Sequence, residues 1–173
     1  MPKVIFNEAI TDVFFRMTEK QEKEKKEQFG TGYGRIVNGQ FVLDCFEEWP
    51  EHLFDSRLEG SIVIKDKAWD WVFFNMEMKQ ADFIFTLHTH PEWYGSNRPL
   101  DANDTETFKQ WSEYFRKDYK RDDIININGI MALNGGLHLH VYDNTSDRFF
   151  EVGYEVDYNN QYVDEPVPGR GGR

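Results

Sequence analysis

Apolar residues recur at helical spacing in three stretches of the chain, each preceded by a residue that can cap a helix. The first stretch covers residues 7–26, the second follows Asp66, and the third covers residues 101–117. Within the first stretch, residues 18–27 are almost wholly charged. We therefore expect that part of the helix to extend into solvent, held by ion pairs between successive turns rather than by burial.

Shorter apolar or alternating runs predict strands between and after these helices. Asn38-Gly39 is typical of a tight hairpin turn, and Asn134-Gly135-Gly136 marks a second turn. Residues 47–56 predict a loop. The expected strands cover residues 2–6, 34–37, 40–46, 60–65, 82–88, 124–133, 137–142 and 148–156. This order predicts a mixed α and β fold in which helices flank a sheet.

The length of 173 residues suits one domain, which we assign to residues 1–156. Residues 157–173 lose the hydrophobic periodicity and end in a run of proline, glycine and arginine. They predict a flexible C-terminal tail. The chain shows no internal repeat and no sign of a second domain.

The charge balance narrows the range of partners. The net charge is −11, from 31 acidic and 20 basic residues, which is the wrong sign for binding a phosphate backbone. No apolar run is long enough for a membrane helix, and the first residues lack the apolar core of a secretory signal. The lone Cys45 cannot form an internal disulfide or a zinc site of several cysteines. We expect a cytoplasmic protein that binds neither nucleic acid nor membrane; its oligomeric state stays open.

Two histidines are candidates for a metal site. His88 and His90 are two positions apart on a predicted strand, so their side chains point to the same side and can reach one ion. Pro91 ends the strand, and a carboxylate in the first turn of the next helix could be a third ligand. Zinc would then keep one position open for water, as a catalytic site needs.

The surrounding motif resembles a known family. His88-Thr89-His90-Pro91, followed by Asp101-Ala102-Asn103-Asp104, is similar to the JAMM motif of MPN/JAB-domain metalloproteases, which reads His-(Ser/Thr)-His-Pro, a loop and Ser-x-x-Asp. Glu27 through Gly34 is similar to the family's upstream Glu-x-x-Gly-x-x-x-Gly. The resemblance covers roughly residues 2–142 and is greatest to compact prokaryotic or phage forms. It implies an α/β domain of the α+β type, an MPN/JAB-like mixed sheet flanked by helices in a cytidine-deaminase-like layout.

The resemblance also implies roles for individual residues. His88, His90 and Asp104 correspond to the zinc ligands, and Glu27 corresponds to the general base that takes a proton from the attacking water. Asp101 stands where the family has a serine that helps to hold the oxyanion. Because a carboxylate donates a hydrogen bond only when protonated, we expect Asp101 to cap the helix instead.

A second alignment of the loop stays open. Without a gap, Asp101 becomes the zinc aspartate and Arg98 takes the serine position. We prefer Asp104 because the Asp-x-x-Asp spacing then keeps a cap followed by a ligand.

By this resemblance the protein is expected to be a zinc metalloprotease or isopeptidase. Its substrate would be a peptide or isopeptide bond, at the glycine-rich C-terminus of a ubiquitin-like protein. Two alternatives remain: an amidase or peptidase acting on a small or cell-wall peptide, and a non-catalytic MPN scaffold. The scaffold ranks last because family scaffolds typically lose the metal ligands.

Four other residues attract attention near or within the predicted strands. His138 and His140 also share one side of a strand, and we expect them to face solvent because no nearby carboxylate completes a site. Trp93 and Tyr94 follow the histidine pair. Binding of substrate and packing against the next helix are about equally expected for these two aromatic residues.

Overall fold

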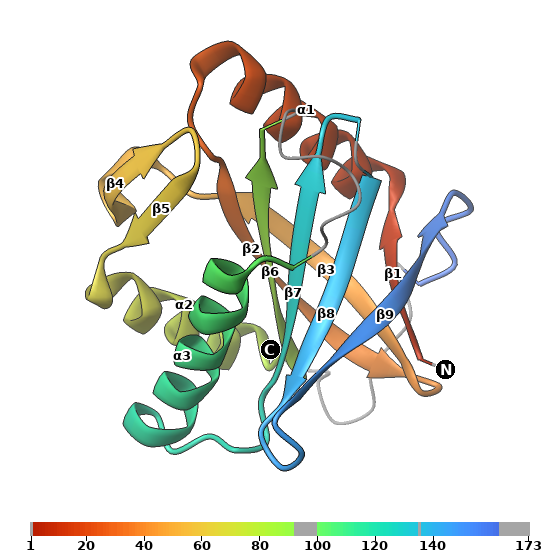
Figure 1. Ribbon diagram of the computed structural model, residues 1–173. Helices are drawn as coiled ribbons and strands as arrows, with labels where there is room; N and C mark the ends of the chain where they lie inside the picture. The colour runs from red at the N-terminus through yellow and green to blue at the C-terminus, as the bar shows by residue number, and fades with distance from the viewer. Residues whose placement is uncertain (1, 92–99, 135, 163–173) are drawn as a thin grey trace.

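Seven strands form a closed barrel in the computed structural model, which describes residues 2–91, 100–134 and 136–162 (Figure 1). Their order around the barrel is β1-β3-β2-β6-β7-β8-β9. The barrel strands are β1 (Lys3–Asn7), β2 (Phe29–Val37), β3 (Gln40–Glu48), β6 (Phe83–His90), β7 (Ile125–Ala132), β8 (Gly136–Asp143) and β9 (Arg148–Asp157).

The remaining elements lie around this barrel. A two-stranded hairpin follows β3 and a short 3-10 helix, and three α-helices are inserted between strands. In Figure 1 the hairpin, α2 and α3 lie together on one flank of the barrel. These elements are α1 (Glu8–Glu24), η1 (Glu51–Leu53), β4 (Phe54–Leu58), β5 (Ser61–Ile64), α2 (Asp66–Lys79) and α3 (Ala102–Asp118).

Closure of the barrel contradicts the predicted fold class. Helices and strands are both present, but the sheet is not the open, helix-flanked mixed sheet expected for an MPN/JAB-like, cytidine-deaminase-like layout. Strand β1 is parallel to both β3 and β9, so that Val4 pairs with Phe41 on one side and with Tyr154 on the other. Hydrophobic periodicity identifies strands but carries no information on which strand pairs with which, so it did not reveal this closure.

Alternation along β6 divides the core into two clusters. Phe83, Phe85 and Leu87 belong to a cluster that includes Phe14 and Met17 of α1. Ile84, on the opposite face of β6, belongs to a second cluster built with α2, α3 and the β4–β5 hairpin. Because strand side chains alternate, the even-numbered residues of β6 all face this second cluster.

Helix α1 begins as predicted but differs in its second half. Asn7 caps it, accepting a hydrogen bond from the backbone N–H of Ile10 at 3.0 Å, and the helix ends at Glu24 before a left-handed Lys25. The prediction of a solvated second half is wrong for Thr18 and Gln21, whose side chains are 0% and 1% exposed. These two polar residues lie on the buried face of the helix. The high content of charged residues in this stretch did not predict their burial.

The glycines of β2 allow close contact with β3. A Cβ atom on Gly34 would lie 2.1 Å from the carbonyl oxygen of Val42, and one on Gly30 would lie 2.6 Å from that of Glu47. After β2 the chain turns at Asn38 and Gly39, both with positive φ, which confirms the predicted hairpin turn.

The predicted loop at residues 47–56 contains more structure than expected. It includes the end of β3, η1 and the start of β4, which pairs with β5 to form the hairpin. At the other end of the chain, β9 runs to Asp157, and the main-chain carbonyl of Tyr162 accepts a hydrogen bond from Arg35 at 2.8 Å. The rest of the predicted tail lies outside the described residues. No helix in the described part of the chain is long and apolar enough to span a membrane.

Candidate metal centre

The two candidate histidines lie side by side at the end of β6. Both face the second core cluster, as their even spacing from Ile84 requires, and their side chains are buried. Their Nε2 atoms are 3.0 Å apart. The strand thus brings two imidazole nitrogens to one point beneath α3, as the sequence predicted.

Asp104 completes the group from the first turn of α3. Its Oδ1 lies 3.0 Å from Nε2 of His88, and its Oδ2 lies 3.4 Å from Nε2 of His90. Burial alone would raise the pKa of Asp104, but the hydrogen bonds and charges of the two imidazoles outweigh it and hold the pKa below its ordinary value. The carboxylate therefore stays ionised, as a metal ligand must.

These three side chains could hold a metal ion. Their ligand atoms all lie within 4.8 Å of one another. Donors about 2.0–2.1 Å from a tetrahedral zinc ion are roughly 3.3 Å apart, close to the separations seen between these atoms. Two imidazoles and one carboxylate are also a donor set that first-row divalent metals accept.

Asp101 caps α3 and orients Asp104. Its Oδ1 accepts a hydrogen bond from the backbone N–H of Asp104 at 2.7 Å, and Oδ2 of Asp104 accepts one from the backbone N–H of Asp101 at 3.4 Å. This reciprocal pair is a capping box. Of the two aspartates, Asp104 is the one grouped with the histidines; Arg98, which the other alignment needs, lies outside the described residues.

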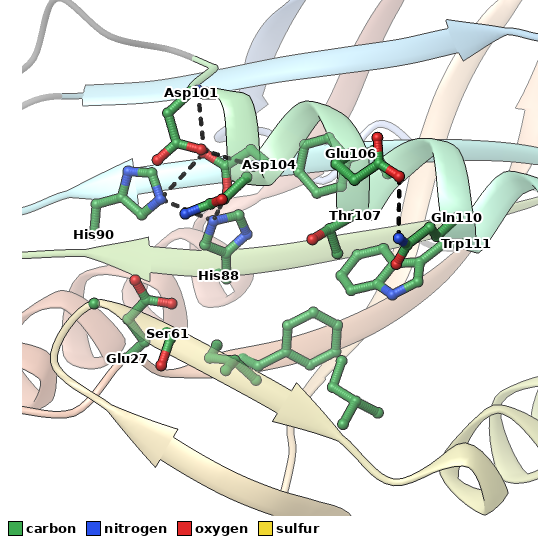
Figure 2. A pocket seen from close by; sticks show the side chains of 16 residues that line it. Glu27, Ser61, His88, His90, Asp101, Asp104, Glu106, Thr107, Gln110 and Trp111 are labelled. Carbon is green, nitrogen blue, oxygen red and sulfur yellow. Dashed lines mark hydrogen bonds and ion pairs between the residues drawn. The ribbon is translucent and has the colours of Figure 1, made fainter.

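Glu27 reaches the same pocket from the segment between α1 and β2. Figure 2 shows it across the pocket from Asp101 and Asp104, with His88 and His90 between them. Its side chain is buried, and burial, followed by the negative charges of Asp104 and Asp101, raises its pKa to about 9. The carboxyl group is therefore sensitive to any positive charge brought into the pocket.

The pocket itself is a cavity of about 290 Å³ between α3, β6 and the hairpin. The hairpin strand β5 contributes Ser61, Ile62 and Ile64 to one wall, and α3 contributes Thr107 and Trp111 to the other. No lysine or arginine is among the described residues that line the pocket. The sequence predicts a strand at residues 60–65, but no sequence feature indicates that this strand lies beside the histidines.

The second histidine pair departs from its prediction. His140 is only 4% exposed, and β8 lies between β7 and β9 rather than at an edge. Burial lowers the pKa of His140. The expectation that it faces solvent is wrong because its neighbours in the barrel were unknown. His138 is partly buried, 3.6 Å from a carboxylate oxygen of Glu151. The described residues give neither histidine a place in a metal-ligand group. Trp93 and Tyr94 lie outside the described residues.

Comparison with solved structures identifies a protein with the same fold but gives no information on chemistry. The chain is similar to the solution structure of protein DSY2949 from Desulfitobacterium hafniense, with a TM-score of 0.60 and 11% sequence identity. The match covers 94% of this chain and 99% of that chain. At this identity the likeness shows a shared fold and nothing about activity. No family model and no curated protein matches the chain.

Proposed function

We propose that this protein is a zinc-dependent hydrolase that cleaves a peptide or isopeptide bond, in the manner of the JAMM metalloproteases. The observation that carries the proposal is the grouping of His88, His90 and Asp104 in one pocket with the buried carboxyl group of Glu27. Three protein ligands with a nearby proton acceptor are what hydrolysis at a metal requires. The resemblance selected the same four residues from sequence.

The residues have separate tasks in this proposal. His88, His90 and Asp104 would hold the ion, as the three protein ligands of a catalytic zinc site. When bound, zinc acts as a Lewis acid that polarises a carbonyl group and acidifies water. Glu27 takes the proton from the attacking water and passes it to the nitrogen of the leaving amine. A cation in the pocket favours the ionised form of Glu27, reversing the rise in its pKa.

The position of β5 in the pocket wall suits binding of an extended chain. Among the described residues, β5 pairs with β4 alone, so its other edge offers backbone groups beside the candidate metal site. A glycine-rich segment passes such a site without side-chain clashes. We therefore propose that the substrate is the glycine-rich C-terminus of a ubiquitin-like protein, and that the bond cleaved there is a peptide or an isopeptide bond.

Metal analysis tests the first part of the proposal. We expect close to one zinc per chain after reconstitution, and its loss in His88→Ala. The matched control is His52→Ala, because His52 is exposed and lies outside the pocket. A protein that takes up no metal with both histidines intact would favour the non-catalytic scaffold.

Hydrolysis by Glu27→Gln tests the second part. The variant should retain zinc and lose activity by at least about 100-fold, because general-base catalysis contributes that much. Glu24→Gln is the control: Glu24 is exposed at the end of α1 and should be dispensable. Assays on ubiquitin-like fusions and on short amides, run side by side, decide between the isopeptidase and the small-peptide amidase. Full activity in Glu27→Gln would remove Glu27 from the mechanism.

A further inference from the structure

A buried set of hydrogen bonds joins the segment that carries Glu27 to the strand that carries both histidines. Oγ1 of Thr89 accepts a hydrogen bond from the backbone N–H of Gln28 at 2.8 Å and donates one to Oε1 of Gln21, also at 2.8 Å. The backbone N–H of Thr89 donates to the carbonyl of Gln28 at 3.0 Å. Thr89, Gln28 and Gln21 are each 0–1% exposed.

Alternation along β6 explains why Thr89 can make these contacts. Its side chain points to the opposite face from the imidazoles on either side of it, toward α1 and the chain that follows it. The strand therefore presents ligands on one face and a hydroxyl group that holds Gln28 on the other. A change at Thr89 can act on the neighbour of Glu27 without removing a ligand.

The hairpin holds the same segment from a second side. Nη1 of Arg57 donates to Oε1 of Gln28 at 2.8 Å, and the backbone N–H of Glu27 donates to the carbonyl of Leu58 at 2.8 Å. The Gln28 side chain also donates to the carbonyl of Lys26 at 2.8 Å. By contrast, no described residue donates a hydrogen bond to the Glu27 carboxyl group, so the hydrogen bonds that position Glu27 are those of its backbone and of its neighbour Gln28.

We propose that Thr89 and Gln28 are positioning residues, which hold the backbone of Glu27 at a set distance from the candidate metal ligands. Thr89 ties this backbone to β6, and Gln28 ties it to β4 through Arg57. The inference rests on the proposed function, in which Glu27 is the general base. Neither residue touches substrate; each acts through Glu27.

The pair Thr89→Val and Thr89→Ser tests the role of the hydroxyl group. Valine keeps the shape of threonine without the hydrogen bonds, whereas serine keeps the hydroxyl. In the zinc-loaded protein we expect Thr89→Val to retain its zinc and its KM while kcat falls by about 10- to 100-fold, the effect of a small misplacement of a reacting group. Thr89→Ser should restore most of kcat.

Amide hydrogen exchange gives a readout that needs no activity. In the metal-free protein, the Gln28 amide should exchange at least about tenfold faster in Thr89→Val than in wild type, because its buried acceptor is gone, and Thr89→Ser should restore its protection. If Thr89→Val does not fold, Gln28→Met replaces it: this variant keeps the backbone contacts to Thr89, loses the contact to Arg57, and should lower kcat with zinc retained.

The outcomes separate the two proposals. A wild-type protein that binds zinc and hydrolyses no substrate overturns the proposed function. An active wild type with an inactive Glu27→Gln, but with Thr89→Val unchanged in both kcat and Gln28 exchange, overturns the positioning role alone. Equal loss of kcat in Thr89→Val and Thr89→Ser also overturns it, because the hydroxyl would then not be the group that matters.

Discussion

The Nε2 atom of His88 lies 3.0 Å from Oδ1 of Asp104, although the two residues belong to different elements, β6 and α3. The capping box with Asp101 accounts for the orientation of this carboxylate, because it holds the third residue of the helix by both its backbone and its side chain. The same hydrogen bonds that begin α3 therefore also direct Asp104 at the imidazoles. Asp104 thus takes part both in the helix cap and in the candidate metal site.

Zinc should stabilise the folded protein. Because the unfolded chain does not keep His88, His90 and Asp104 together, zinc at 100 times its Kd should add about 2.7 kcal/mol to the free energy of unfolding. For a domain of this size that raises Tm by roughly 5–10 °C, measured by calorimetry with zinc and with a chelator. Asp104→Asn should remove most of the shift, whereas Glu106→Gln should keep it. An unchanged Tm in wild type would contradict the metal site.

Glu27 should make the metal-free protein less stable as pH rises. Its pKa is raised from 4.5 to about 9 in the fold, so its favourable contribution is complete below pH 4.5 and is lost as pH rises through 9. The loss should approach 1.4 kcal/mol per pH unit within this window. Urea unfolding of wild type and Glu27→Gln at several pH values measures it. Stability curves that run parallel from pH 5 to pH 8 would show that Glu27 is not perturbed.

Asp101→Ala should damage both the helix and the metal site. Loss of the N-cap should cost about 1 kcal/mol of stability. The Asp104 backbone N–H loses its acceptor, Oδ1 of Asp101, which loosens the first turn that carries the Asp104 carboxylate. Zinc binding should weaken by about 10-fold or more, as loss of a group that orients a ligand does. Asp101→Ser is the matched control, because serine caps a helix equally well and should stay close to wild type in both measurements. An Asp101→Ala variant with unaltered zinc affinity would separate capping from metal binding.

Gly34→Ala should destabilise the barrel. A methyl group there would lie 2.1 Å from the Val42 carbonyl oxygen and 2.4 Å from the ring of Phe83, so β2 must move away from β3. The cost should be at least about 1–3 kcal/mol, measured by urea unfolding. Gly60→Ala is the control, since no atom of the described residues beyond its chain neighbours lies within 4 Å of its Cβ position, and it should change stability by less than about 0.5 kcal/mol. Similar stabilities for the two variants would mean that β2 and β3 tolerate a wider separation.

Local chemistry predicted several features correctly. His88 and His90 are two positions apart on a strand, so both rings lie on the same face. This follows from backbone geometry and needs no tertiary information. The same is true of the Asn7 and Asp101 caps and of the Asn38-Gly39 turn, where side chains bond to neighbouring backbone or permit positive φ. Each of these depends on residues within a few positions along the chain.

Burial and pairing could not be predicted in this way. Gln21 lies in a strongly charged stretch, yet its side chain is buried and its Oε1 accepts a hydrogen bond from Thr89, 68 residues away. His140 is buried on β8, which pairs with β7 on one side and with β9 on the other. In both cases exposure depends on how other elements of the fold pack around the side chain.

The sequence by itself determined that His88 and His90 share one face of a strand and that Asp101 caps the helix that follows. Only the tertiary structure decided that β1 joins β9 to close the barrel, that the β4–β5 hairpin forms a wall of the pocket, and that Glu27 lies opposite Asp104. The physical reason is the separation along the chain of the residues that interact. Caps, turns and the face on which a strand residue lies depend on neighbouring residues. Strand pairing and the surroundings of a side chain depend on contacts across the whole chain.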